Sequence, residues 1–116
     1  MDFSELSEAE IVAIATPIMD NLMEASMRID HGAHTRDFTP RLKAIVTEEH
    51  LQRVCTKVQA EKGLFGERRL VAVFRRPDSA ALVWRQTFSK VAGEYVAEMV
   101  LVHRGGEYLC DHAMVF

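Results

Sequence analysis

Three polar side chains stand among the aromatic residues of the last third of the chain: Gln86, Cys110 and His112. A histidine titrates near neutral pH and can serve as a general acid or base. A cysteine beside it gains reactivity only if a nearby positive charge or helix end helps the thiol to ionise. His112 is therefore the best catalytic candidate. The alternative is a buried histidine that hydrogen-bonds to a backbone carbonyl or to Gln86.

A second polar cluster, made of Asp30, His31, His34 and Asp37, has the composition of a metal site. His31 and His34 are three residues apart, but Gly32 lies between them and the segment reads as a loop. A structural metal needs three or four fixed ligands. We therefore expect an exposed loop here, and no metal or other cofactor in this protein.

The strands that would position Gln86, Cys110 and His112 follow from the hydrophobic pattern. Residues 68–116 contain four runs in which apolar residues alternate with period two and are rich in β-branched and aromatic types, which is typical of strands. Turn-forming sequences separate the runs, at Pro77-Asp78, at Gly93 and at Gly105-Gly106. Because short connections make neighbouring strands antiparallel, we expect a four-stranded antiparallel sheet.

Strict alternation sorts the strand residues onto two faces of this sheet. One face collects Leu70, Phe74, Trp84, Gln86, Phe88, Tyr95, Met99, Tyr108, Cys110, His112 and Phe116. The other collects Val71, Val73, Val83, Arg85, Val96, Glu98, Val100, Val102, Leu109, Asp111 and Val115. A sheet that helices cover on one side turns its bulkiest apolar face toward them, so the aromatic face is predicted to be the inner one.

The first half of the chain is predicted to be helical. Ser7 and Glu10 form a capping box, and apolar residues then recur at three-and-four spacing as far as Ile29. Pro17 lies inside this run and predicts either a kink or a fresh helix start. Gly32 is expected to end the helix.

Two shorter helices are expected next. Thr39-Pro40 begins the first of them, with proline in the favoured first position, and Thr47 caps the second. The apolar stripe of the second consists of Leu51, Val54, Cys55 and Val58. Helices followed by an antiparallel sheet make a single α+β domain over residues 1–116.

Three segments of the chain carry a family resemblance. They are Phe38-Thr39-Pro40-Arg41-Leu42, Val46-Thr47-Glu48-Glu49-His50-Leu51 and Gly63-Leu64-Phe65-Gly66. Together with the long first helix and the long strands, they make the chain resemble the nuclear transport factor 2-like superfamily from about Ser7 to Phe116. The resemblance implies a cystatin-like cone, in which a curved sheet wraps the helices around a conical pocket, and many members dimerise through the outer sheet face. Its members include isomerases, dehydratases, hydrolases and binding domains, so the fold does not decide the function.

No catalytic set of the superfamily is complete in this sequence. The first helix lacks the tyrosine of the isomerases, and Arg85 and Asp111, which resemble part of a hydrolase set, are predicted to lie on the outer face. A histidine and tyrosines of the dehydratase type are present without an aspartate on the inner strands. We therefore expect a small-ligand-binding or interaction domain. The alternative is a small enzyme of the isomerase, dehydratase or hydrolase type that acts on a hydrophobic molecule with His112 as the acid or base.

The two faces predict a ligand site and a dimer interface. A cavity with a few polar groups among aromatic residues is the usual form of a small-molecule site. The expected lining is Met23, Phe38, Trp84, Gln86, Tyr95, Met99, Cys110 and His112. The outer face is more apolar than a solvated sheet should be, which predicts a homodimer. A two-fold axis there would let Arg85 of one copy meet Glu98 or Asp111 of the other.

Composition narrows the class of protein. The chain has 116 residues, 48% of them hydrophobic and 27% charged, with a net charge of −3. These values are typical of one globular domain and argue against a nucleic-acid partner. No apolar run approaches the roughly 20 residues of a membrane span. The first residues do not form a secretory signal, and there are only two cysteines, Cys55 and Cys110, so we expect a cytoplasmic protein with reduced thiols.

Overall fold

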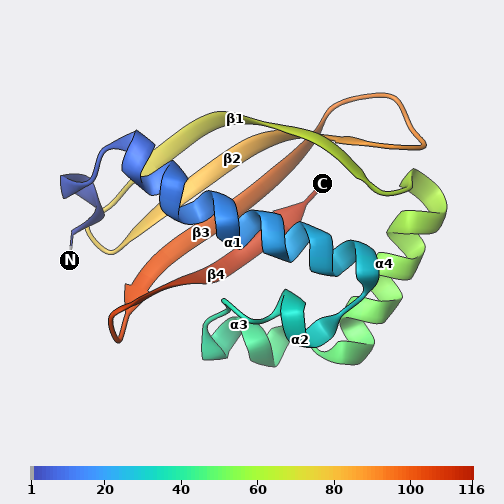
Figure 1. Ribbon diagram of the computed structural model, residues 1–116, viewed down its shortest axis with the longest axis horizontal. Helices are drawn as coiled ribbons and strands as arrows, with labels where there is room; N and C mark the ends of the chain where they lie inside the picture. The colour runs from blue at the N-terminus through green and yellow to red at the C-terminus, as the bar shows by residue number, and fades with distance from the viewer. Residues whose placement is uncertain (1) are drawn as a thin grey trace.

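The computed structural model describes residues 2–116. Helical segments come first along the chain, and all strands follow (Figure 1). The elements are η1 (Phe3–Glu5), α1 (Glu8–Arg28), α2 (His31–His34), α3 (Pro40–Ile45), α4 (Glu48–Lys62), β1 (Phe65–Arg75), β2 (Ser79–Phe88), β3 (Tyr95–Arg104) and β4 (Glu107–Val115). Within this part of the chain, no helix combines the length and the apolar character that crossing a bilayer demands.

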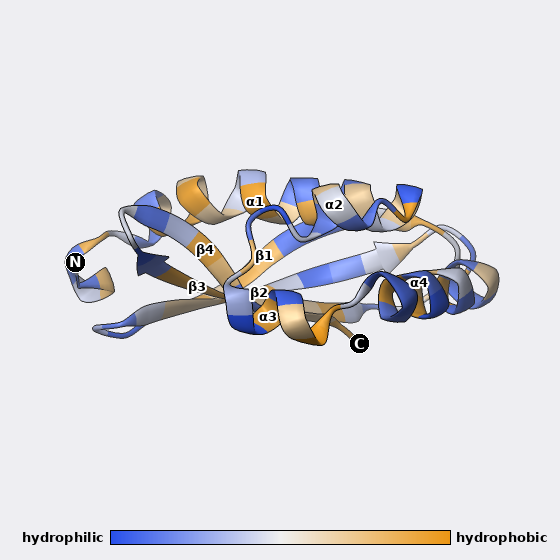
Figure 2. Cartoon of the chain, turned by 90° about the horizontal axis from the view of Figure 1, so that it is seen from below, coloured by the Kyte–Doolittle hydropathy of each residue, from blue (hydrophilic) through white to orange (hydrophobic). Residues whose placement is uncertain are grey.

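The strands form one antiparallel sheet in the order β1-β2-β3-β4, which confirms the predicted α+β class. Figure 1 shows α1 lying across one face of the sheet, with α2 and α3 beside β4. In the view of Figure 2, α1 forms a layer over the sheet and α4 stands at one end of it. The sheet is therefore covered unevenly, with one long helix on its face and the shorter helices around one corner.

The start of α1 agrees with the sequence, but its end does not. Ser7 and Glu10 make both hydrogen bonds of a capping box. Pro17 lies inside a single helix that runs to Arg28, so the fresh start that was one of two expectations is not found. The helix ends at Ile29, which adopts a left-handed conformation with φ 53°, and not at Gly32. Asp30 can then cap α2, where the sequence predicted a loop.

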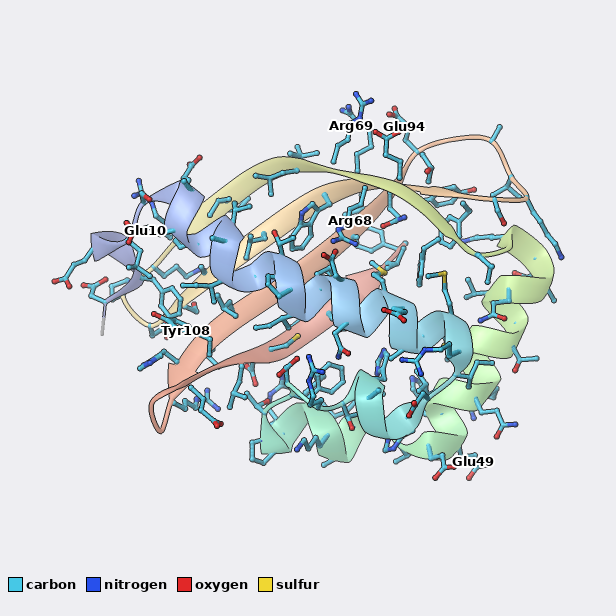
Figure 3. All side chains as sticks on the ribbon, viewed as in Figure 1. Glu10, Glu49, Arg68, Arg69, Glu94 and Tyr108 are labelled. Carbon is cyan, nitrogen blue, oxygen red and sulfur yellow. The ribbon has the colours of Figure 1, made fainter. Side chains whose placement is uncertain are left out.

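The core lies between α1 and the inner face of the sheet. The buried side of α1 contributes Ile11, Ala15, Met19, Leu22 and Met23, and the sheet contributes Ala80, Leu82, Trp84, Ala97, Met99, Leu101 and Cys110. Arg68 closes one side of this layer, because its guanidinium pairs with Asp20 of α1 and stands over the Trp84 ring at 5.5 Å (Figure 3). The inner face is thus packed directly against α1 along much of its length.

Two extra residues interrupt the alternation that the sequence analysis assumed. In β1, Leu70 pairs with Trp84 and Ala72 with Val83, which leaves Val71 without a partner in the register. In β4, Cys110 pairs with Leu101 and His112 with Val100, which leaves Asp111 over. A β-bulge of this kind shifts every later side chain to the opposite face.

These bulges correct several predicted orientations. After Asp111, His112 lies on the outer face opposite Val100, while Ala113 and Val115 pack against the core. The predicted inward orientation of His112 is therefore wrong. After Val71, Val73 packs against the core, and Phe74 is turned outward and is 54% exposed. Val73 accordingly leaves the predicted dimer face.

A segment far away in sequence holds the bulge of β4. The backbone of residues 37–39 pairs with Cys110, whose N–H donates to Asp37 O at 2.7 Å and whose carbonyl accepts from Thr39 N at 3.0 Å. The Thr39 hydroxyl donates to Asp111 Oδ1 at 2.7 Å, and Arg41 Nε donates to the same oxygen at 3.2 Å. Asp111 is thus engaged at the edge of the sheet and is not a free charge on the outer face.

The contacts of Asp111 predict a pH-dependent contribution to stability. Burial alone would raise the pKa of this carboxyl, but the hydrogen bonds from Thr39 and Arg41 outweigh burial and leave the pKa below its ordinary value of 3.8. A carboxyl whose pKa is lower in the folded state stabilises the fold at neutral pH, and this stabilisation is lost as the pH falls through the folded-state pKa. Asp111→Asn should cost about 1–3 kcal/mol at neutral pH.

Urea unfolding of the wild type and of Asp111→Asn at pH 7 and near pH 2.5, about one unit or more below the ordinary carboxyl pKa, checks this expectation. The difference between the two proteins should shrink at the lower pH. Asp78→Asn, at an exposed turn, is the matched control. An equal difference for Asp111→Asn at both pH values would show that the ionised carboxyl contributes nothing.

Candidate functional site

A cavity of about 280 Å³ opens between the C-terminal half of α1, the length of α4 and the end of β4. Its volume is close to the lower end, about 300 Å³, of the range for small-molecule pockets. Most of the lining is apolar: Met19, Leu22, Met23 and Met27 from α1, Leu51, Val54 and Val58 from α4, Ala113 and Val115 from β4, and Phe38, Leu42, Val46, Leu64, Phe65 and Phe88 from the segments between. The cavity therefore suits a largely apolar molecule.

The position of α4 creates this space. The Gln59 side-chain amide of α4 donates to the carbonyls of Ser26 at 3.3 Å and Met27 at 3.0 Å. These carbonyls lie in the last turn of α1, where the helix runs out of internal donors, and the Ser26 carbonyl also accepts from Ile29 N at 3.1 Å. Gln59 thus ties α4 to the end of α1 and away from the face of the sheet. The apolar stripe of α4 then borders an open space, with Leu51 buried and Val54 40% exposed.

His34 is the most unusual polar group of the cavity. Its side chain is 8% exposed, and its ring meets the Phe38 ring edge-on with 5.2 Å between centroids. Within residues 2–116 neither ring nitrogen has a hydrogen-bond partner, and Nδ1 is fully buried. Burial, with a smaller contribution from the charge of His31, lowers the pKa of His34 to about 4. The ring is therefore neutral at pH 7, and since Nδ1 is buried, Nε2 is the nitrogen that can meet an occupant of the cavity, as donor or acceptor according to the tautomer.

The two thiols are not activated. Burial raises the pKa of Cys55, which lines the cavity, although a hydrogen bond with Ser26 opposes the shift. Burial also raises the pKa of Cys110 to about 12. Because the thiolate is the nucleophile, neither cysteine has the character of a catalytic residue at neutral pH.

The structure separates the predicted ligand-binding residues into two groups. Met23 and Phe38 line the cavity. Trp84, Met99 and Cys110 instead fill the core beneath α1 and do not line the open space.

Three further predicted residues lie elsewhere. Gln86 is completely buried, and its amide nitrogen donates to the backbone carbonyls of Gly66 at 3.0 Å and Thr87 at 2.9 Å, so it holds the irregular start of β1. Tyr95 is half-buried against Phe88, with 5.1 Å between ring centroids. His112 lies on the outer face, where its Nε2 is 2.6 Å from Glu98 Oε2.

The cluster considered for a metal is divided among separate tasks. Asp30 caps α2 and pairs with Arg28, His31 Nε2 lies 2.8 Å from the Val46 carbonyl, and Asp37 pairs with Arg36. His34 faces the cavity alone. Across residues 2–116, no three His, Cys, Asp or Glu side chains come together in the manner of a metal site.

Sequence reasoning missed the polar residues that do line the cavity, namely Ser26, His34, His50, Gln59 and Lys62. A signal for His34 was present, because an aspartate such as Asp30 often caps a helix that begins at the next residue. A signal for Lys62 was present as well. It continues the three-and-four spacing of Leu51, Cys55 and Val58 on α4.

Solved structures with the same architecture identify the fold. A structure of an Rd1NTF2_05 variant superposes with a TM-score of 0.61 at 13% identity, and the match covers 92% of this chain and 99% of that one. An NTF2-like protein of unknown function from Shewanella baltica OS155 gives a TM-score of 0.59 at 7% identity over 97% of each chain. The fold is NTF2-like.

A third match is RPA3114, a SEC-C motif containing protein from Rhodopseudomonas palustris, with a TM-score of 0.57 at 12% identity over 90% of each chain. No family model matches the sequence, and no curated protein matches it either. At these identities the likeness concerns the NTF2-like fold alone, and the function has to be argued from the cavity.

The buried position of His34 predicts how its ring titrates. A histidine whose pKa is lower in the folded state than in the unfolded state stabilises the fold above the unfolded-state value of 6.5, and this stabilisation decreases as the pH falls from 6.5 toward 4. The ring signals of His34 in NMR spectra should stay constant from pH 8 down to about pH 5. They are assigned by their absence from His34→Leu.

His34→Leu should also lose less stability than the wild type between pH 6.5 and about pH 4.5, because it has no buried imidazole to protonate. Urea unfolding across this range measures the difference. A His34 signal that titrates near 6.5, as in an unfolded chain, would contradict the buried and uncharged state.

Proposed function

We propose that this protein binds a small, largely apolar molecule that carries a hydrogen-bonding group, in the cavity between α1, α4 and the end of β4. The unpartnered His34 ring in the wall of this cavity is the observation that carries the proposal. A buried polar group without a partner costs about 1–3 kcal/mol. A ligand that hydrogen-bonds to Nε2 of this ring and fills the apolar space gives the ring a polar partner and adds packing contacts.

The chemistry of His34 limits the ligand. A neutral imidazole has one donor and one acceptor nitrogen, so either a hydroxyl or a carbonyl group of the ligand can satisfy it. The rest of the lining offers methionine and valine side chains. Met19, Met23 and Met27 are flexible and polarisable, and such side chains adapt to ligands of irregular shape.

The alternative enzyme, with His112 as its acid or base, receives no support from the geometry. His112 lies on the outer face of the sheet, where its side chain contacts Glu98. The cavity lining, as far as the structure describes it, contains no aspartate or glutamate that could orient His34 or share a proton with it. General acid–base catalysis in the cavity would therefore depend on His34, whose pKa is about 4, and on His50, with no carboxylate in the described lining to assist either ring.

A ligand panel tests the binding proposal. Small apolar acids, alcohols and steroids are screened by thermal shift, and the compounds that stabilise the protein are titrated by calorimetry. His34→Leu should weaken the best ligand about tenfold, which corresponds to the loss of one hydrogen bond.

His112→Leu is the matched control, because it removes a histidine from the outer face and should leave the affinity unchanged. If His112→Leu weakens binding and His34→Leu does not, the ligand occupies a different site. If no compound of the panel stabilises the wild type, the binding function itself is contradicted.

We further propose that two copies associate through the outer face of the sheet. Val83, Val96 and Val100 are only half-buried there, although they lie at the middle of the sheet. The bulges add Phe74 at 54% exposure and Met114 at 51% to the same face. Contiguous apolar surface of this kind commonly marks an interface.

The charges of this face are arranged differently from the prediction. Arg85 pairs with Glu94 at 2.9 Å within the chain, and Glu98 contacts His112. Figure 3 shows Glu94 and Arg69 projecting outward beside β1. The predicted meeting of Arg85 with Glu98 or Asp111 of a second copy is therefore not needed, since each of these groups has a partner in its own chain.

The predicted interface residues now fall into three sets. Val73 faces the core and Asp111 is held at the sheet edge, so neither belongs to the proposed interface. Val102 lies on the outer side but is buried already. The residues that remain for contact between copies are Val71, Val83, Arg85, Val96, Glu98 and Val100, with Phe74, Met114 and Phe116 added.

Sedimentation velocity tests the dimer. Val100→Glu should convert a dimer to monomer, because it places a second carboxylate beside Glu98 in a surface that association would bury. Ala13→Glu, on the exposed side of α1, adds the same charge and should leave the dimer intact. A wild type that sediments as a monomer at high micromolar concentration would contradict this proposal without affecting the ligand site.

A further inference from the structure

The only permanent charge in the described lining of the cavity is positive. Among the lining residues that the structure describes, Lys62 is the one lysine or arginine, and there is no aspartate or glutamate. The chain as a whole has more acidic than basic residues, 17 against 14. A cavity wall without a carboxylate therefore does not follow from the composition, and it leaves the Lys62 ammonium as the dominant local charge.

Lys62 has no carboxylate partner within the described part of the chain. No ion pair involves it among residues 2–116, and its Nζ rests over the Tyr95 ring at 4.7 Å and the Phe88 ring at 5.6 Å. Phe88 is itself part of the cavity wall. Cation–π contacts of this kind hold an ammonium in place without neutralising it, so the charge remains available to an anion.

The place of Lys62 on α4 has a structural explanation that accounts for only part of these facts. A lysine in the last turn of a helix interacts favourably with the negative end of the helix dipole. This explains why a lysine is tolerated at position 62. It does not explain why every acidic side chain of the described lining is missing, nor why the ammonium lies on a ring of the cavity wall.

The shape of the cavity adds a further constraint. Its lining follows α4 from His50 to Lys62, which corresponds to about 18 Å of helix at 1.5 Å per residue. Lys62 lies at the end near the start of β1, and His34 comes from α2, beside the other end of α4 (Figure 1). The space between these polar groups is bordered by methionine and valine side chains. An elongated apolar body with its charge at one end matches this layout.

We propose that the natural ligand is an apolar carboxylic acid, whose carboxylate pairs with Lys62 while its body lies along the apolar wall between α1 and α4. The inference rests on the ligand-binding function proposed above. A carboxylate fits better than a phosphate, because phosphate sites gather arginines or helix N-termini, and the described lining contains neither beside Lys62. A cationic ligand would be repelled by the ammonium, and a neutral one would leave it over the aromatic rings.

Calorimetric titration with octanoate and octanamide tests the charge requirement, since the two probes share a chain length and differ in charge. The wild type at pH 7 should bind octanoate about tenfold more tightly than octanamide, because a charge-assisted hydrogen bond is roughly twice as strong as a neutral one. Lys62→Gln should abolish this preference and leave the affinity for octanamide within about twofold. Octanoate binding should also weaken in high salt, because the mouth of the cavity is open to solvent.

Lys57→Gln is the matched control, because Lys57 is exposed on the same helix, lies outside the cavity lining and carries the same charge. It should keep the preference for octanoate. Equal binding of both probes by the wild type, or an equal loss of preference in Lys57→Gln, would overturn the assignment of an acid and leave the ligand-binding function standing. Absence of binding for both probes, together with a silent thermal-shift panel, would contradict the two proposals together.

Discussion

One extra residue in β4 determines much of what this NTF2-like chain presents to its surroundings. The bulge at Asp111 turns His112 to the outer face and brings Ala113 and Val115 to the inner one. The Thr39 hydroxyl and the Arg41 guanidinium bind the Asp111 carboxylate, so the same contact fixes the segment that places Phe38 in the cavity wall. If β4 paired with β3 without this bulge, His112 would face inward, and Ala113 and Val115 would be turned away from the cavity. The composition of the cavity and of the outer face therefore both depend on a local event at the edge of the sheet.

The sequence was sufficient for the architecture because that architecture rests on local signals. The capping box at Ser7, the proline at position 40 and the turn glycines act over a few residues, and the structure contains each element that they predicted. The bulges carry no such signal. Both sets of alternating positions in β4 contain apolar residues, so the pattern is compatible with either parity. The group that stabilises the bulge lies 72 residues away in sequence, which no periodicity can reveal.

The position of the site was missed for a related reason. The sequence pattern placed the pocket on the aromatic face of the sheet, because polar side chains alternate there with aromatic ones. In the structure α1 packs directly on that face, and Trp84 and Met99 fill the space beneath it. Gln59 holds α4 to the end of α1, so the open space lies between these two helices and the end of β4. His34 then matters because it is the polar group left unpaired where these elements meet.

The methionines of the chain provide a direct test of this account, because they lie in different layers. Met23 and Met27 line the cavity, whereas Met99 is completely buried beneath α1 and does not. Octanoate can be titrated into protein labelled with ¹³C at the methionine methyl groups while NMR spectra are recorded. The account predicts that the Met23 and Met27 signals shift with ligand concentration and that the Met99 signal stays in place. A dominant shift of Met99, with Met23 and Met27 unchanged, would place the ligand at the centre of the sheet and contradict the account.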